Sequence, residues 1–169
     1  VNNNNKVGAI LFGDKVQKFI APKKAKQHTL YIVREMLSND AKSKQTNYHD
    51  AFRMFNNVCP RRSICFLISD FLGAGYEDAL RVASKKHDVI GIKIYDQLDM
   101  KLPDAGLLQV ADAETGEQRW IDTSNAQVRF DYEKDFHKHN DYVKDVFRKA
   151  GADLLHMRAG DDYVKVLQK

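Results

Sequence analysis

The segment Ile64–Ile68 (ICFLI) constrains the fold most strongly, because its consecutive apolar residues leave no polar face. A strand that is apolar on both faces is typical of the centre of a parallel sheet with helices on each side. Ser69 and Asp70 follow where this strand ends. Val89–Tyr95 (VIGIKIY) has the same character and ends at Asp96. We therefore expect two neighbouring parallel strands, each followed by an acidic residue.

Helical periodicity follows each of these strands. The segment Tyr76–Ala83 has apolar residues at i, i+3, i+4 and i+7, which predicts an amphipathic helix. A long helix over 128–150 should end at Gly151, the residue type that most easily adopts the left-handed conformation at a helix end. Leu154–Met157 is then a third strand, and a last helix covers Tyr163–Leu167. Alternating strands and helices predict an α/β fold with a mostly parallel sheet.

Two antiparallel hairpins are expected beside this sheet. The first joins Val7–Phe12 to Val16–Ile20 around a Gly-Asp pair, with Pro22 ending its second strand, and it should form an antiparallel edge. The second joins Leu107–Val110 to Gln118–Ile121 across acidic turn residues and a glycine.

Side-chain caps are expected at two helix starts. Thr46 precedes an apolar helical face over 48–55, and its hydroxyl could accept a hydrogen bond from a first-turn amide. Ser124 with Gln127 has the spacing of a capping box before the long helix. Another helical stripe covers Leu30–Leu37.

The length of 169 residues favours one domain over 1–169. The net charge of +4 comes largely from early lysines, which we interpret as a solvated face and not as a nucleic-acid surface, because no binding motif accompanies them. The two cysteines, Cys59 and Cys65, are too few for a disulfide framework, which favours the cytoplasm. No apolar stretch approaches the ~18 residues that a membrane helix needs, so we expect no membrane contact.

The carboxyl ends of the parallel strands are where a ligand would bind. Asp70 is therefore the first candidate and Asp96 the second, and Thr46 could face the same edge. Carboxylate and hydroxyl oxygens are hard ligands that suit magnesium, calcium or manganese. The competing interpretation is structural: Thr46 caps a helix and Asp70 caps a turn.

An enzyme is the alternative. Gly73 and Gly75 follow a strand, like the start of a dinucleotide-binding loop, but Asp78 stands at the third glycine position and would repel a pyrophosphate. A flavodoxin-like or Rossmann-like enzyme would use Asp70 as a catalytic or metal-binding carboxylate. It would require a ligand pocket near the two glycines.

Several segments together resemble one bacterial family. They are VGAILFGDKVQKFIAPKKAKQH, TNYHDAF, RRSICFLISDF, HDVIGIKIYDQLDMKLPDAGLLQVADAETGE and AGADLLHMRAGDDYVKVL. The most specific are ISDF, the D-x-x-x-x-x-LP-x-x-G pattern over Asp96–Gly106, and the acidic turn Glu114–Glu117. This is the domain-of-unknown-function family fifty-eight, and the resemblance implies a von Willebrand factor A-like, Rossmann-like fold.

The resemblance also implies part of a metal-ion-dependent adhesion site. Thr46 matches the threonine of its second loop and Asp70 the aspartate of its third, while the Asp-x-Ser-x-Ser of the first loop is not found. Asp122-Thr-Ser124 looks similar but lies after the second hairpin, and Ala126 replaces the last serine. We therefore interpret the chain as a partial domain that lacks the first strand of the family's sheet. We expect Mg²⁺, Mn²⁺ or Ca²⁺ to bind the full-length protein and this piece to bind none.

The function that the resemblance implies is a non-catalytic interaction or adaptor module of a bacterial protein. Its implied partner is a MoxR-type AAA+ ATPase. A third hypothesis is a partner-binding domain without a metal. Without the first strand, the edge of Ile64–Ile68 would be open, so we also expect a homo-oligomer.

Overall fold

The structure is a computed structural model that describes residues 5–39, 45–73, 75–111 and 117–168. The chain divides into two units, Val1–Pro60 and Arg61–Lys169, and each unit is described by itself. The expectation of a single domain over 1–169 stays a prediction. The acidic turn predicted at Glu114–Glu117 lies mostly outside the described residues.

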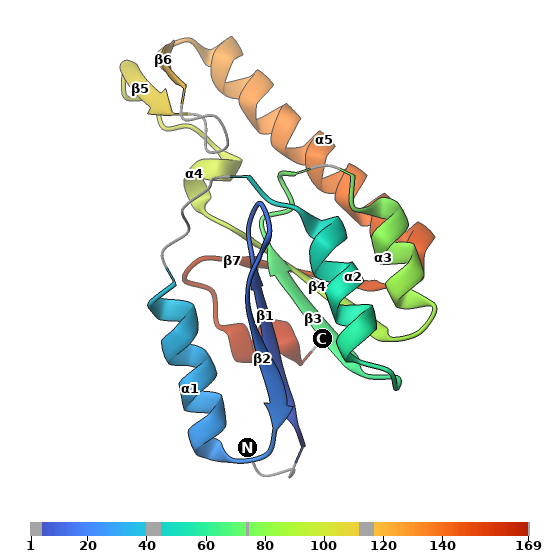
Figure 1. The fold of residues 1–169 in the computed structure, drawn as a ribbon. Coiled ribbons are helices and arrows are strands. Elements are labelled where there is room, and N and C mark those ends of the chain that lie inside the picture. Colours follow the sequence, from blue (N-terminus) through green and yellow to red (C-terminus); the bar gives the residue numbers. More distant parts are fainter. Residues whose placement is uncertain (1–4, 40–44, 74, 112–116, 169) are drawn as a thin grey trace. The chain divides into compact units, whose positions relative to one another are not determined.

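The first unit is a β-hairpin followed by two helices (Figure 1). Its elements are β1 (Val7–Phe12), β2 (Val16–Lys23), α1 (Lys26–Leu37) and α2 (Tyr48–Val58). The antiparallel pairing of β1 with β2 confirms the first hairpin, and Ile10 lies opposite Phe19. The pair forms a sheet of its own among the described residues. Pro22 lies inside β2 and does not end it. Each strand of a two-stranded ribbon has one unpaired edge, and proline, which lacks an N–H, is tolerated on such an edge.

The start of α2 corrects one expectation. Asn47, not Thr46, is the N-cap residue, and its side-chain oxygen accepts a hydrogen bond from Asp50 N at 3.1 Å. Asparagine is at least as good a cap as threonine. The Asn47 backbone N–H also donates to Gly13 O at 2.7 Å, which ties the start of α2 to the hairpin turn.

The second unit contains a three-stranded parallel sheet. Its elements are β3 (Ile64–Ser69), α3 (Glu77–Ser84), β4 (Asp88–Tyr95), α4 (Gln97–Met100), β5 (Leu107–Ala111), β6 (Gln118–Asp122), α5 (Ala126–Ala150), β7 (Asp153–Arg158) and α6 (Tyr163–Leu167). The order β3-β4-β7 and the parallel pairing confirm the predicted neighbours. The fold of this unit is Rossmann-like, with an antiparallel β5–β6 pair between α4 and α5.

Close packing of the long helix on the sheet depends on Gly91 in β4. A Cβ added at Gly91 would lie 2.4 Å and 2.5 Å from ring atoms of Phe147 on α5, and 2.9 Å from a methyl carbon of Leu154. Phe147 is 1% exposed, as expected for a ring that lies against the backbone of the central strand. Leu67 on β3 pairs with Gly91 and is also buried, so these residues mark the face that α5 covers.

The ends of α5 follow local sequence, with one correction. Gly151 ends the helix at φ 70°, the left-handed conformation predicted for it. Asn125 is the N-cap and accepts from Gln127 N at 2.9 Å, so the capping box expected from Ser124 does not form. The Ser124 hydroxyl instead donates to Asp122 Oδ1 at 2.6 Å. A capping box does form at α4, between Asp96 and Asp99.

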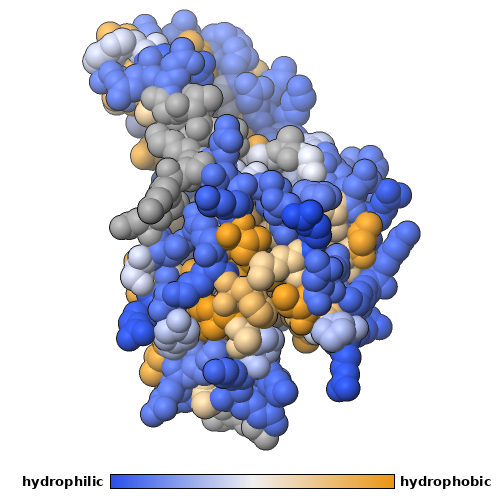
Figure 2. Space-filling model, in the orientation of Figure 1, coloured by the Kyte–Doolittle hydropathy of each residue, from blue (hydrophilic) through white to orange (hydrophobic). Residues whose placement is uncertain are grey.

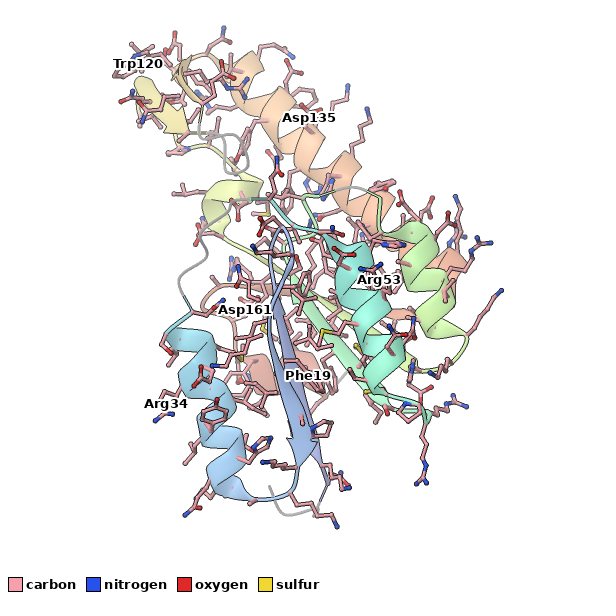
Figure 3. All side chains as sticks on the ribbon, in the orientation of Figure 1. Phe19, Arg34, Arg53, Trp120, Asp135 and Asp161 are labelled. Atoms are coloured by element: carbon pink, nitrogen blue, oxygen red, sulfur yellow. The ribbon has the colours of Figure 1, made fainter. Side chains whose placement is uncertain are left out.

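The β5–β6 hairpin confirms the second predicted hairpin. Arg129 near the start of α5 donates to Thr123 O at 2.6 Å and pairs with Asp104 at 3.3 Å, which ties the hairpin to the helix. Trp120 on β6 is 62% exposed (Figure 3). None of the helices in the described parts of the chain is long and apolar enough to cross a membrane.

Candidate functional site

The turn after β3 presents the carboxylate of Asp70. Asp70 is exposed and directly follows the last residue of the strand. Its Oδ1 accepts a hydrogen bond from Leu72 N at 3.2 Å, and the Ser69 hydroxyl accepts one from Phe71 N at 3.2 Å. These local bonds hold the turn in one conformation, so the carboxylate has a defined place at the carboxyl end of the sheet.

The side chain of Phe71 anchors this turn in the core. Its φ is +56°, a left-handed conformation that costs a non-glycine residue roughly 1–2 kcal/mol. Its ring is fully buried and packs edge-on against Phe147, with 5.2 Å between ring centroids, and against Tyr76 at 5.7 Å. The packing of the ring maintains the unfavourable backbone, which is a pattern found where a site needs a particular geometry.

Lys93 supports the same turn from the central strand. It lies in β4 opposite Ser69, is only 2% exposed, and donates from Nζ to Asp70 O at 2.9 Å. Burial lowers the pKa of Lys93, and the carboxylates of Asp70 and Asp99 partly oppose that shift. The ammonium group therefore anchors the backbone of the candidate residue and adds positive charge beneath it.

Two histidines extend this buried basic cluster. His156 on β7 pairs with Lys93 across the sheet, and His139 on α5 lies beside the Phe71 backbone. Burial lowers the pKa of both imidazoles. The charge of Lys93 lowers the pKa of His139 further, and the charges of Lys144 and Lys93 lower the pKa of His156 further. Nε2 of each ring has no hydrogen-bond partner among the described residues. Three basic side chains thus lie under the Asp70 turn.

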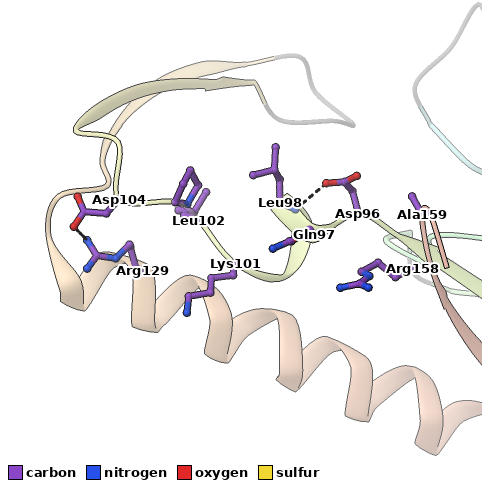
Figure 4. A pocket seen from close by; sticks show the side chains of 11 residues that line it. Asp96, Gln97, Leu98, Lys101, Leu102, Asp104, Arg129, Arg158 and Ala159 are labelled. Atoms are coloured by element: carbon purple, nitrogen blue, oxygen red, sulfur yellow. Dashed lines mark hydrogen bonds and ion pairs between the residues drawn. The ribbon is translucent and has the colours of Figure 1, made fainter.

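The second sequence candidate, Asp96, has a structural role. Its side chain accepts from Leu98 N at 2.8 Å as the N-cap of α4. It also lines a shallow cavity of about 740 Å³ at the ends of β4 and β7, together with Lys101, Arg129 and Arg158 (Figure 4). Arg158 is paired with Asp161 at 3.0 Å. The cavity is open, and both of its arginines already have carboxylate partners, because Arg129 also pairs with Asp104.

Thr46 and Asp70 belong to different units, so the prediction that they share one edge stays a prediction. Thr46 is half-buried and directly precedes the cap of α2. Asp122 and Ser124 are occupied with each other at the end of β6, consistent with their interpretation as part of a local turn. Gly73 and Gly75 do not line the cavity described above, so that cavity is not where the enzyme hypothesis would place it.

The donor types suit a divalent ion. Asp70 offers an exposed carboxylate, and the neighbouring Ser69 and the separate Thr46 offer hydroxyls, all hard oxygen ligands. No cluster of three or more histidine, cysteine, aspartate or glutamate side chains with metal-binding spacing occurs in the described part of the chain. Asp70 can therefore contribute to an ion site, but the remaining ligands must be supplied by other groups.

Sequence reasoning found Asp70 but missed the residues that hold it. Lys93 was visible as the single charge inside the apolar run VIGIKIY, which is the signal that could have identified it. The roles of Phe71 and His139 could not be read from spacing, because α5 reaches the turn only in the folded chain.

A parallel α/β sheet that presents a carboxylate beyond the end of one strand defines a Rossmann-like protein with its candidate site at the usual edge. Its sequence also matches a known family. It belongs to the family described as protein of unknown function DUF58, whose model matches residues 1–142.

The relatives are uncharacterized proteins of mycobacteria. One, from Mycobacterium avium, is 36% identical over 105 residues, which is 62% of this chain and 62% of that protein. Another, from Mycobacterium tuberculosis, is 34% identical over 105 residues, which is 62% of this chain and 33% of that protein. The chain thus matches less than two thirds of either relative. No solved structure matches the chain significantly.

Proposed function

We propose that this chain is a non-catalytic protein-interaction module in which Asp70 helps to hold a divalent ion that binds a carboxylate of the partner. The observation that carries the proposal is the exposed Asp70 carboxylate, fixed at the carboxyl end of β3 by the buried Phe71 ring and the Lys93 ammonium. A carboxylate held in one place by groups beneath it is suited to binding, because little ordering remains when the ligand arrives.

Thr46 is the second proposed ligand, and the ion is Mg²⁺ or Mn²⁺, with Ca²⁺ as the larger alternative. Such ions take about six to eight oxygen ligands. Two side chains leave most positions to water, so this chain alone should bind the ion weakly. A partner carboxylate, together with an Asp-x-Ser-x-Ser loop in the full-length protein, would complete the shell. The ion would supply positive charge that links two carboxylates.

The proposed partner is a MoxR-type AAA+ ATPase, and the proposed compartment is the cytoplasm. This partner is proposed from the family resemblance alone, since the description of the family names no function. The ion site at Asp70 can be tested without knowing the partner, because ion binding can be measured on the chain itself.

Manganese broadening of amide resonances tests the site at low affinity. Unpaired electrons of Mn²⁺ broaden nearby signals even when the ion binds weakly. We expect the amides around Asp70 and Thr46 to broaden first, and Asp70→Ala to abolish the effect. Asp135→Ala is the matched control, because Asp135 is an exposed carboxylate on α5 (Figure 3).

Broadening that is centred elsewhere, or that persists in Asp70→Ala, would contradict the ion site. Broadening at Asp70 without Thr46 would remove Thr46 from it. Binding of the ATPase is then compared in Mn²⁺ and in chelator for the same variants. Loss of binding in chelator and in Asp70→Ala, but not in Asp135→Ala, is the expected result.

A further inference from the structure

The cavity at the ends of β4 and β7 is a feature of the second unit that the proposed function does not use. Its walls are α4, the loop after α4, the start of α5 and the turn after β7, and its volume is about 740 Å³ (Figure 4). All of its lining residues belong to the second unit, so the cavity is formed within that unit. None of the residues Ser69–Leu72 lines it, so it is separate from the proposed ion site.

Positive charge exceeds negative charge in this cavity. Three cationic side chains line it, Lys101, Arg129 and Arg158, against the two carboxylates of Asp96 and Asp104. Along the cavity the cations follow one another in the order Arg129, Lys101, Arg158 (Figure 4). Asp96 is already engaged as the cap of α4, and the first turn of α5 has no acidic residue to offset the positive end of its dipole. A ligand with several negative charges in a row therefore fits this cavity.

Arg129 is held in place and still has N–H groups for a ligand. Its Nη1 donates to Thr123 O at 2.6 Å and to Ser124 O at 3.0 Å, and the same atom lies 3.3 Å from a carboxylate oxygen of Asp104. These contacts leave Nε and Nη2, whose two N–H groups can bind both oxygens of one carboxylate. The Asp104 side chain is 64% exposed, so its pairing with Arg129 is a surface ion pair that contributes little.

Lys101 and Arg158 offer two further donors. Lys101 is exposed, and none of the ion pairs among the described residues involves it. Arg158 donates from Nε at 3.2 Å and from Nη2 at 3.0 Å to one oxygen of Asp161, which leaves Nη1. Its side chain is 45% exposed. Each of the cations in the cavity therefore has a donor for a carboxylate from outside the chain.

We propose that this cavity binds an acidic peptide segment of another protein in an extended conformation. Carboxylates of the segment bind Arg129, Lys101 and Arg158 in turn. Leu98 also lines the cavity and is 59% exposed, so it contacts an apolar side chain that lies between the acidic ones. The ligand is thus a segment in which acidic residues alternate with apolar ones.

The open form of the cavity favours a peptide over a nucleotide or another small molecule. Small-molecule sites usually enclose most of the ligand and have few polar groups, whereas this cavity is open and its charges are spread along it. Phosphate sites often use successive backbone N–H groups of a loop, and the lining here consists mainly of side chains. Figure 2 shows a mainly hydrophilic surface around β5, β6 and the start of α5 on the side in view, so charge should dominate binding there.

The cavity and the ion site can be tested separately. Peptide binding is measured in metal-free buffer, where no ion can link Asp70 to a carboxylate. Asp70→Ala should then bind the peptide as the natural chain does. Lys101→Glu should lose the peptide and retain manganese broadening at Asp70. Either proposal can therefore fail while the other holds.

Amide chemical shifts of the isotope-labelled full chain report binding at low affinity. The probe is the hexapeptide Asp-Glu-Leu-Asp-Glu-Leu with both ends blocked. We expect shifts at the amides of Lys101, Arg129 and Ala159, with a dissociation constant on the order of 1 mM at low salt. Binding should weaken at least roughly tenfold in about 0.5 M salt, because exposed ion pairs are screened. The uncharged peptide Asn-Gln-Leu-Asn-Gln-Leu should cause no shift.

One substitution should strengthen binding, which loss of the fold cannot imitate. Asp104→Asn removes the internal carboxylate that competes for Arg129, so the peptide should bind roughly threefold more tightly. Asp135→Asn is the matched control, because it changes the net charge equally at an exposed position of α5 outside the cavity. Its effect on affinity should be much smaller.

A charge reversal should weaken binding. Lys101→Glu places a carboxylate among those of the peptide, so affinity should fall at least roughly tenfold. Lys138→Glu is the matched control, because Lys138 is exposed on α5 and does not line the cavity.

No shift with the acidic peptide, shifts centred away from the cavity, or equal effects of Asp104→Asn and Asp135→Asn would overturn the proposal. Loss of peptide binding in Asp70→Ala would overturn it as well, because the peptide would then bind at the ion site. Pyrophosphate is titrated in parallel. If it shifts the same amides more strongly than the peptide does at equal concentration, the cavity is a phosphate site and the peptide proposal is wrong.

Discussion

Gly91 offers the sharpest test of the packing in the second unit. Gly91→Ala adds a methyl group where the ring of Phe147 already lies, at distances of 2.4 Å and 2.5 Å from two ring atoms. Real contacts of this kind are close to 3.4 Å or longer, so the ring must move by about 1 Å. Phe147 is buried between α5 and the sheet, so that movement shifts the helix or forces an unfavourable rotamer.

The expected cost is about 2–3 kcal/mol in the free energy of unfolding, the upper part of the range for an overpacked core. Urea denaturation, followed by circular dichroism, measures it. A double-mutant cycle with Phe147→Leu provides the control, because leucine removes the ring atoms that clash. Gly91→Ala should cost at least 1 kcal/mol less in the Phe147→Leu background, since contacting residues are not additive.

The outcome that would refute this reasoning is an equal cost of Gly91→Ala in both backgrounds. A neutral effect in the natural background would contradict it equally, because it would mean that α5 does not approach β4 as closely as the structure shows. If the cost is the same in both backgrounds, its source would be Leu154, whose methyl carbon is 2.9 Å from the added atom.

Two further predictions concern the turn and the cluster beneath it. Phe71→Ala should destabilise the protein by about 3–5 kcal/mol. Phe71→Gly should destabilise it by about 1 kcal/mol less, because glycine adopts φ +56° without strain. If the glycine variant were instead less stable than the alanine variant, as is usual, the backbone of Phe71 would not be strained. His139 and His156 have pKa values lowered below 6.5 by burial, so the unfolded chain binds more protons, and stability should fall as pH decreases from about 6.5. Urea denaturation at several pH values measures this, and His156→Gln should flatten the dependence; an identical slope in the variant would exclude His156 as a source.

The parallel sheet could be predicted because its strands have a strong local signal. Ile64–Ile68 and Val89–Tyr95 are apolar on both faces, and few structures other than a covered central strand accommodate such runs. The pairing β3-β4-β7 followed from the helices between them. Helix starts were less predictable, because several neighbouring polar residues can each cap. Asn47 displaced Thr46, and Asn125 displaced Ser124, by a single position in each case.

The candidate site was predictable only in its exposed part. Asp70 stands at the end of a recognisable strand, and chemistry at that edge is a general property of such sheets. The groups beneath it come from β4, β7 and α5, and their meeting depends on register and helix orientation. Nothing in the spacing of His139 or His156 indicates that both lie close to Lys93.

The turn after β3 combines two features that lower stability, and both act on Asp70. Lys93 in the central strand is only 2% exposed, so its ammonium is desolvated, and an apolar side chain of similar length would avoid that cost. Phe71 has a left-handed backbone that glycine would adopt without strain. The Lys93 ammonium holds the carbonyl of Asp70, and the Phe71 ring holds the next residue in the core. Because unfavourable features persist where the geometry itself is needed, their meeting at one exposed carboxylate supports binding by Asp70 over a role as a turn cap alone.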